Sequence, residues 1–173
     1  MSGRSKRQAA VGSALFFLAA PGVVAGLVPW WLTGYRLTPS GQWLLGLRVG
    51  VGVLLVLAGL AVLVRAFVRF VAEGHGTPAP VAPPETLVVG GAYRYVRNPM
   101  YVAVVTCLIG QAVIFGSLKL DVYTVLIWLA MAAFVRWYEE PALLDRFGPS
   151  YSTYRRAVRA WIPRVHPWTA PEP

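Results

Sequence analysis

One run of apolar residues decides the fold class of this chain: residues 43–64 read WLLGLRVGVGVLLVLAGLAVLV. The run is long enough to cross the hydrocarbon of a bilayer as a helix, which takes about 20 residues. Its glycines at 46, 50 and 52 are small enough to let a second helix approach closely. Arg48 lies near one end, and we expect its guanidinium to reach outward to the membrane surface.

Three further apolar runs flank this segment, at about residues 9–32, 100–116 and 122–138. The last two are slightly short for untilted spans but long enough for a helical hairpin. The chain of 173 residues is 57% hydrophobic and only 13% charged, whereas soluble domains are about a quarter charged. We therefore predict an all-α integral membrane protein with four transmembrane helices, forming one domain over residues 1–173. A secretory signal peptide is the alternative for the first run.

Basic residues are distributed unequally between the two ends of these spans. Thirteen of them lie on the side that carries both termini, and two, Arg36 and Lys119, lie on the other. The positive-inside rule then places both termini in the cytoplasm, together with the proline-rich segment 74–84. The net charge of +9 is explained by this topology and by anionic lipid headgroups, so we expect membrane lipids as partners and no nucleic acid.

The residue types that build disulfides and metal sites are sparse. Cys107 is the only cysteine and lies inside an apolar run, which indicates packing rather than chemistry. His75 and His166 are far apart in sequence and lack the spacing of metal ligands. We predict no metal site.

Polar residues gather in two places beside the apolar runs. Residues 91–101 read GAYRYVRNPMY, and the pair Glu139–Glu140 closes the last run. Ionisable groups at the end of a span are costly and need partners. Both segments fall on the predicted cytoplasmic side, where they offer cations, carboxylates, aromatic faces and backbone amides. Such a set suits a pocket for a charged, nucleotide-like cofactor, and we expect an interfacial helix after Glu139.

Taken in order, these segments resemble the isoprenylcysteine carboxyl methyltransferase family, whose relatives include membrane phospholipid N-methyltransferases. The family pattern combines Gly-x-Tyr-x-x-x-Arg-His-Pro-x-Tyr, a helical hairpin, Glu-Glu-x-x-Leu-x-x-x-Phe-Gly-x-x-Tyr-x-x-Tyr and a final Ile-Pro. The matching residues cover about the C-terminal half of the chain and are Gly91, Tyr93, Arg97, Pro99, Tyr101, Glu139, Glu140, Leu143, Phe147, Gly148, Tyr151, Tyr154, Ile162 and Pro163.

The resemblance implies S-adenosylmethionine as the cofactor, bound within about residues 85–163. Carboxylates at Glu139 and Glu140 can accept hydrogen bonds from its ammonium or ribose. Arg97 and Asn98 can donate to its carboxylate. No Gly-x-Gly-x-x-Gly sequence is present, so a Rossmann-type methyltransferase is not indicated.

Aromatic rings and backbone amides would complete this cofactor site. Tyr93 or Tyr101 can lie near the sulfonium, because an aromatic face attracts a cation. Backbone amides from Val88 to Gly91 can reach the adenine or the amino-acid end, and the glycine pair permits close approach.

The resemblance also directs attention to two other positions. The family's eukaryotic enzymes carry His where this chain has Asn98, which can donate a hydrogen bond but cannot form an imidazolium. The family carries a comparable arginine at about the position of Arg69. We predict that Arg69 holds the anionic end of the methyl acceptor. The acceptor is expected to be lipophilic (a prenylated thiol carboxylate, a lipid or a small hydrophobic molecule) and to enter laterally from the bilayer.

Other interpretations of the same residues remain open. Glu139 and Glu140 could simply pair with Arg136, and Arg97 could anchor to lipid phosphates. A nicotinamide-dependent membrane reductase would require more spans and extra basic residues. A non-enzymatic four-span transporter or scaffold is disfavoured, because a transporter places ionisable groups at mid-membrane.

Overall fold

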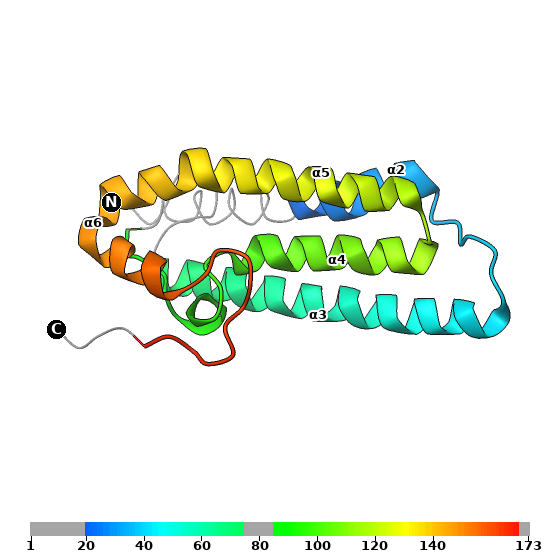
Figure 1. The fold of residues 1–173 in the computed structure, drawn as a ribbon, viewed down its shortest axis with the longest axis horizontal. Helices are drawn as coiled ribbons and strands as arrows, with labels where there is room; N and C mark the ends of the chain where they lie inside the picture. Colours follow the sequence, from blue (N-terminus) through cyan, green and yellow to red (C-terminus); the bar gives the residue numbers. More distant parts are fainter. Residues whose placement is uncertain (1–19, 75–84, 170–173) are drawn as a thin grey trace, which may run out of the picture.

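The computed structural model describes residues 20–74 and 85–169, and all regular structure within them is helical (Figure 1). The helical run Ala20–Thr33 contains the π-helix η1 (Val23–Leu27) and α2 (Val28–Thr33). The other helices are α3 (Gln42–Gly74), η2 (Gly91–Arg94), α4 (Pro99–Phe115), α5 (Leu118–Phe134), η3 (Val135–Glu139) and α6 (Glu140–Ala157). Figure 1 shows α3, α4 and α5 running lengthwise through the molecule, with α6 and η2 at one end.

Two of these helices are long and apolar enough to cross a membrane, namely Gln42–Glu73 and Leu118–Ala157. Ala20–Thr33 and Pro99–Phe115 are shorter apolar helices. The 17 residues of α4 extend roughly 25 Å, which is less than the hydrocarbon thickness of about 30 Å. The predicted first span falls within the described residues only from residue 20 onward, and the proline-rich residues 75–84, with His75, lie outside them.

Glycines allow α3 and α4 to pack closely. A Cβ atom at Gly52 would lie 2.6 Å from the carbonyl oxygen of Gly110, and one at Gly59 would lie 2.6 Å from the Cys107 sulfur. The predicted small face is therefore confirmed at Gly52, whereas Gly46 and Gly50 have nothing within 4 Å of an added Cβ. Cys107 is buried in this contact, and its role in packing is confirmed.

Arg48 does not reach outward, so that expectation was wrong. Its Nε atom donates to the carbonyl of Val113 (3.1 Å), and Nη2 donates to that of Ile114 (3.2 Å). These carbonyls belong to the last turn of α4, where no intrahelical donor is available. Gly116, with φ of 57°, ends the helix beside the guanidinium. Arg48 thus caps α4 instead of extending to the membrane surface.

The last helix also differs from expectation. We predicted that a separate interfacial helix would begin after Glu139, but α5 continues through the π-helical turn η3 into α6 without a break. The change of direction occurs nine residues later at Gly148, where φ is 50° and ψ is −122°. This conformation suits glycine, which has no Cβ to clash. Beyond the bend, Tyr151, Tyr154 and Val158 form a buried cluster.

Residues 158–168, which we name the C-terminal strap, follow α6 without regular structure. The strap is bound to the chain that precedes α4. The amide of Arg97 donates to the carbonyl of Arg159 (2.9 Å), and the amide of Arg164 donates to that of Tyr95 (2.8 Å). Trp168 donates in the same way to the carbonyl of Arg94 (2.9 Å). The strap therefore fixes the turn between η2 and α4 against the end of α6.

Candidate functional site

Charged side chains meet where α6 bends back toward η2, and the buried Glu140 is at their centre. Its Oε1 atom lies 2.8 Å from Nη1 of Arg97, and its Oε2 atom lies 2.9 Å from Nη2 of Arg155. The side chains of Glu140 and Arg97 are only 7% and 11% exposed. Nη1 of Arg97 also donates to the Tyr151 hydroxyl at 3.1 Å. The charge of Glu140 is thus balanced by two arginines within the protein.

Its neighbour Glu139 has a different environment. Oε1 of Glu139 accepts a hydrogen bond from the Tyr101 hydroxyl at 2.7 Å. Within residues 20–74 and 85–169, no arginine or lysine forms an ion pair with Glu139, and Arg136 pairs with neither glutamate. A half-buried carboxylate that lacks a cation can accept one from a ligand.

Tyr93 and Val88 are packing residues in this structure. They are 7% and 6% exposed and form a buried cluster with Ala66 of α3. Burial raises the pKa of the Tyr93 phenol well above its usual range, and the nearby acidic groups of Tyr154, Glu139 and Glu73 raise it further. The phenol therefore stays neutral at any physiological pH. The carbonyl of Tyr93 accepts a hydrogen bond from the Tyr154 hydroxyl at 2.7 Å, which ties η2 to α6.

Arg69 lies at the end of α3, paired with an acid that the sequence analysis overlooked. Its Nε atom is 2.5 Å from Oε1 of Glu73, and its side chain is 51% exposed. Oε2 of Glu73 accepts a hydrogen bond from the amide of Gly90 at 3.1 Å. A Cβ atom at Gly90 would lie 2.2 Å from the Glu73 carboxylate, and one at Gly91 would lie 3.3 Å from Cγ of Arg69. The glycine pair allows the Arg69–Glu73 pair to lie directly against the backbone.

Asn98 precedes α4, and its amide nitrogen donates to the carbonyl of Ala160 in the strap (3.2 Å). One donor of this side chain therefore holds the strap. The second amide hydrogen and the carbonyl oxygen remain available for other partners. A contact between Asn98 and a cofactor carboxylate stays a prediction.

The structure brings the predicted residues together in two groups. Tyr101–Glu139 and Arg97–Glu140 form one group, joined by the adjacent glutamates. The other group consists of Arg69, Val88, Gly91 and Tyr93, in contact around the end of α3. Tyr93 belongs to the second group by packing, and its carbonyl accepts the hydrogen bond from Tyr154 of α6.

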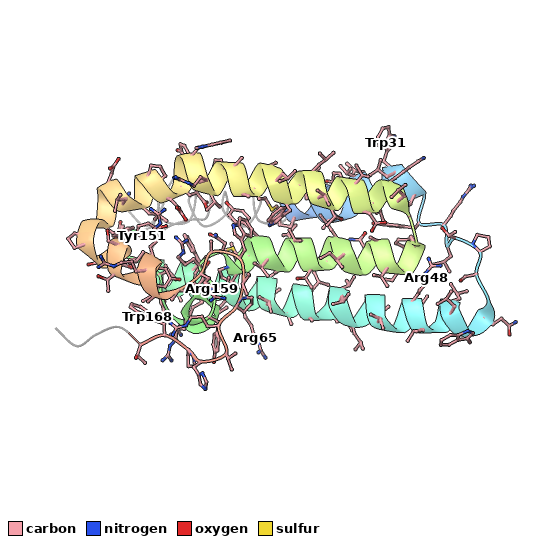
Figure 2. All side chains as sticks on the ribbon, viewed as in Figure 1. Trp31, Arg48, Arg65, Tyr151, Arg159 and Trp168 are labelled. Carbon is pink, nitrogen blue, oxygen red and sulfur yellow. The ribbon has the colours of Figure 1, made fainter. Side chains whose placement is uncertain are left out.

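Two residues of the candidate site were not predicted from the sequence, Glu73 and Arg155. Glu73 lies four residues after Arg69, on the same helical face, and this spacing is a signal that could have found it. Arg155 has no comparable signal, because it reaches Glu140 only through the bend at Gly148. Figure 2 places Tyr151, Arg159 and Trp168 near this end of the molecule and Arg48 toward the other.

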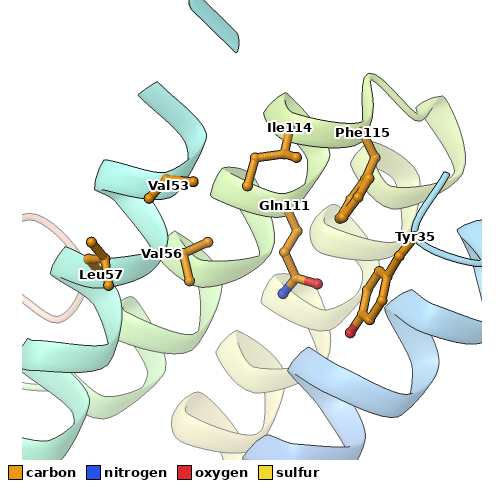
Figure 3. A pocket seen from close by; sticks show the side chains of 7 residues that line it. All are labelled: Tyr35, Val53, Val56, Leu57, Gln111, Ile114 and Phe115. Atoms are coloured by element: carbon orange, nitrogen blue, oxygen red, sulfur yellow. The ribbon is translucent and has the colours of Figure 1, made fainter. Parts of the chain in front are cut away.

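An apolar pocket lies away from these charges, between α3, the end of α4 and the turn after α2 (Figure 3). Its volume is about 310 Å³, and it is lined by Tyr35, Val53, Val56, Leu57, Gln111, Ile114 and Phe115. The two polar groups in this lining are already bonded within the protein. Gln111 donates to the carbonyl of Ala25, and the Tyr35 hydroxyl donates to that of Gly26. The pocket offers hydrocarbon surface and no reacting group.

Comparisons with known proteins found a matching family and a relative that matches part of the chain. The model of the phospholipid methyltransferase family matches residues 47–150. Over 80 residues the chain is 31% identical to the protein-S-isoprenylcysteine O-methyltransferase of Schizosaccharomyces pombe, covering 46% of this chain and 34% of that relative. The chain therefore matches about a third of the relative's length. No solved structure matches the chain.

Proposed function

Because the chain belongs to the phospholipid methyltransferase family, we propose that it transfers a methyl group from S-adenosylmethionine to a lipophilic acceptor at the membrane. The observation that carries the proposal is the pair of unlike glutamates. Glu140 is neutralised by Arg97 and Arg155, whereas the adjacent Glu139 has only the Tyr101 hydroxyl as a partner. A cofactor that carries both positive and negative groups fits this arrangement.

The residues of the site suit the polar end of this cofactor. Glu139 would accept from its ammonium or ribose. Nε of Arg97 is buried without a hydrogen-bond partner among the described residues, and a buried donor of this kind is costly unless a ligand satisfies it. Nε of Arg97 would donate a hydrogen bond to the cofactor carboxylate. When bound, the cofactor supplies a methyl group activated by a positively charged sulfur.

The protein's contribution to the reaction would be orientation and exclusion of water. A carboxylate or thiolate acceptor needs little proton transfer, which agrees with the neutral Tyr93 phenol and the absence of a titrating histidine at position 98. Arg69 would hold the acceptor's anionic end. Its guanidinium is half exposed and is kept in place by Glu73.

The acceptor would reach this site from the bilayer. The name of the Schizosaccharomyces pombe relative indicates a prenylated cysteine as its substrate, and the family name indicates phospholipids. Both substrate classes carry hydrocarbon chains. The outer surface of α3 exposes large apolar residues along its length, including Leu54, Leu57 and Val68 at 68%, 58% and 59%. Because α3 and α4 pack backbone against backbone at Gly52 and Gly59, we place the entry at the end of α3 beside the exposed Val68 and Arg69, with four spans and both termini in the cytoplasm.

Cofactor binding provides the direct test. Purified protein in detergent would be titrated with S-adenosylmethionine by calorimetry and then incubated with the radiolabelled cofactor and a total lipid extract. Glu139→Gln should weaken binding strongly, whereas Glu85→Gln, a change at an exposed residue, should not. Unchanged affinity in the Glu139 variant would remove this carboxylate from the cofactor site, and no label transfer to any lipid fraction would contradict the proposed acceptor class.

A further inference from the structure

Three aromatic rings and one carboxylate, each from a different segment, converge beside the proposed cofactor site. Trp161 of the strap lies with its ring centroid 6.4 Å from that of Tyr101 in α4, the two planes inclined by 30°. Trp128 of α5 lies 6.2 Å from Trp161 at 75°, nearly perpendicular. Tyr101 then donates its hydroxyl to Glu139 in η3. Trp161 thus packs against Tyr101, the ring whose hydroxyl is bonded to the carboxylate.

The placement of Trp161 differs from that of the tryptophans that are typical of a membrane interface. Trp31, Trp43 and Trp137 are each 77% exposed. Trp161 is only partly exposed, contacts two other rings, and lies in the strap that is fixed by backbone hydrogen bonds on both sides of it. A tryptophan that only anchors a protein at the membrane interface does not require two ring contacts and a hydrogen-bonded backbone on both sides. The position of this ring calls for a different explanation.

We propose that Trp161, Tyr101 and Glu139 form a cleft for an onium ion, either a sulfonium or an alkylated ammonium, with Trp128 packed against Trp161. Such cations have no N–H group to donate, or few, and are bound by aromatic faces together with a nearby negative charge. Glu139 supplies that charge, because no cation of the described chain compensates it. The cleft would therefore distinguish a charged ligand from an uncharged ligand of the same shape.

Two sources could supply this ion, and the identification of the first rests on the proposed function. One source is the sulfonium of S-adenosylmethionine, whose demethylated product S-adenosylhomocysteine is the neutral counterpart. The other is the alkylated ammonium of a phospholipid headgroup, for which choline is the probe and 3,3-dimethylbutan-1-ol is the neutral counterpart.

The experiment measures affinities for these four compounds in full-length protein. Trp161→Leu removes the aromatic face and leaves a smaller apolar side chain, and Trp161→Phe retains a weaker face. Trp137→Leu is the matched control, since Trp137 is exposed and lies two residues from Glu139. We expect Trp161→Leu to weaken binding of the charged member of one pair by about 2- to 30-fold. Its neutral counterpart should be unaffected, and Trp161→Phe should fall between.

The outcomes separate the two sources and the two proposals. Loss confined to S-adenosylmethionine supports the sulfonium, and loss confined to choline supports the ammonium. Equal loss for the charged and neutral members of both pairs, or the same effect from Trp137→Leu, would overturn the cleft. If the wild-type protein binds neither S-adenosylmethionine nor S-adenosylhomocysteine, the proposed cofactor fails, while the choline arm still decides the cleft. If both bind without dependence on Trp161, the cleft fails and the proposed cofactor stands.

Discussion

Glu139 and Glu140 are adjacent in the chain, yet their surroundings give them different tasks. Glu140 is buried between Arg97 and Arg155, so it holds α6 against the turn between η2 and α4. Glu139 meets only the Tyr101 hydroxyl and is the residue that a cation would approach. The sequence motif presents them as an equivalent pair. In the structure Glu140 is a paired structural ion, and we propose that Glu139 is the glutamate that binds a ligand.

This division predicts opposite phenotypes for two isosteric variants. Glu140→Gln should lower the free energy of unfolding by about 3–5 kcal/mol, because two arginines lose their counter-charge in a buried setting. Glu139→Gln should change stability far less but should weaken S-adenosylmethionine binding. Thermal unfolding in detergent and calorimetry, applied to both proteins, would check this. Equal destabilisation by the two changes would refute the division.

Gly90 offers a second test at the scale of single residues. Gly90→Ala would bring a methyl group to 2.2 Å from the Glu73 carboxylate and 2.7 Å from Nε of Arg69. We expect a loss of about 1–3 kcal/mol in stability, as in other overpacked sites, with a fall in methyl transfer because Arg69 is displaced. Gly46→Ala is the control, since nothing lies within 4 Å of its added Cβ. A Gly90→Ala protein as stable and active as the Gly46→Ala protein would contradict the assignment.

Among the elements, the C-terminal strap depends on contacts that connect distant parts of the chain. Asn98 holds Ala160, and the backbone of residues 94–97 is hydrogen-bonded to the strap on both sides. Asn98→Leu should loosen the strap, whereas Asn98→His should retain it, because histidine can still donate a hydrogen bond. Hydrogen exchange at the amides of Arg97, Arg164 and Trp168 should accelerate in the leucine variant only. Unchanged exchange there would show that the side chain is not needed to hold the strap.

Helix ends provide another prediction at this scale. Arg48 caps the last carbonyls of α4, so Arg48→Leu should leave them unsatisfied and lower stability by about 1–3 kcal/mol. Arg65→Leu is the control, because Arg65 lies exposed on the same helix. Cofactor affinity should be preserved in Arg48→Leu, since Figure 2 shows Arg48 toward the opposite end of the molecule from Tyr151, which is hydrogen-bonded to Arg97. A larger melting-temperature loss in Arg65→Leu would argue against the cap.

The positions of the helices were more predictable from the sequence than the side-chain contacts between them. Apolar length located α3, α4 and α5, and the motif residues Arg97, Tyr101, Glu139 and Glu140 do meet in space. The long reach of α5 into α6 was missed, because Glu139 and Glu140 interrupt the apolar run without breaking the helix.

The side-chain contacts of Arg155, Trp161 and Arg48 depend on tertiary structure. Arg155 pairs with Glu140 only because the chain turns at Gly148, and Trp161 reaches Tyr101 from a segment without periodicity. From the sequence, Arg48 was expected to reach the membrane surface. Its hydrogen-bond acceptors are backbone carbonyls of α4, and a sequence pattern does not show which carbonyls of another helix lie nearby.

At the scale of the whole molecule, the distribution of charge predicts an orientation. Thirteen basic residues beside the spans fall on the side of both termini. The other side has three, namely Arg36, Lys119 and Arg48, which caps α4 beside Gly116, so we expect both termini to be cytoplasmic. Reporter fusions at Lys119 and at Pro173 should report opposite sides of the membrane. The same side for both fusions would disprove the four-span topology.

The strap also bears on the order in which the protein is made. Every helix that contributes to the site precedes residues 158–168 in the chain, and a ribosome releases them first. Until the strap emerges, the turn at residues 94–97 lacks its backbone partners and Trp161 is absent from the rings around Tyr101. A nascent chain in the membrane would thus hold its helices without a finished site, and the capacity to bind a ligand would arise only when synthesis passes the strap.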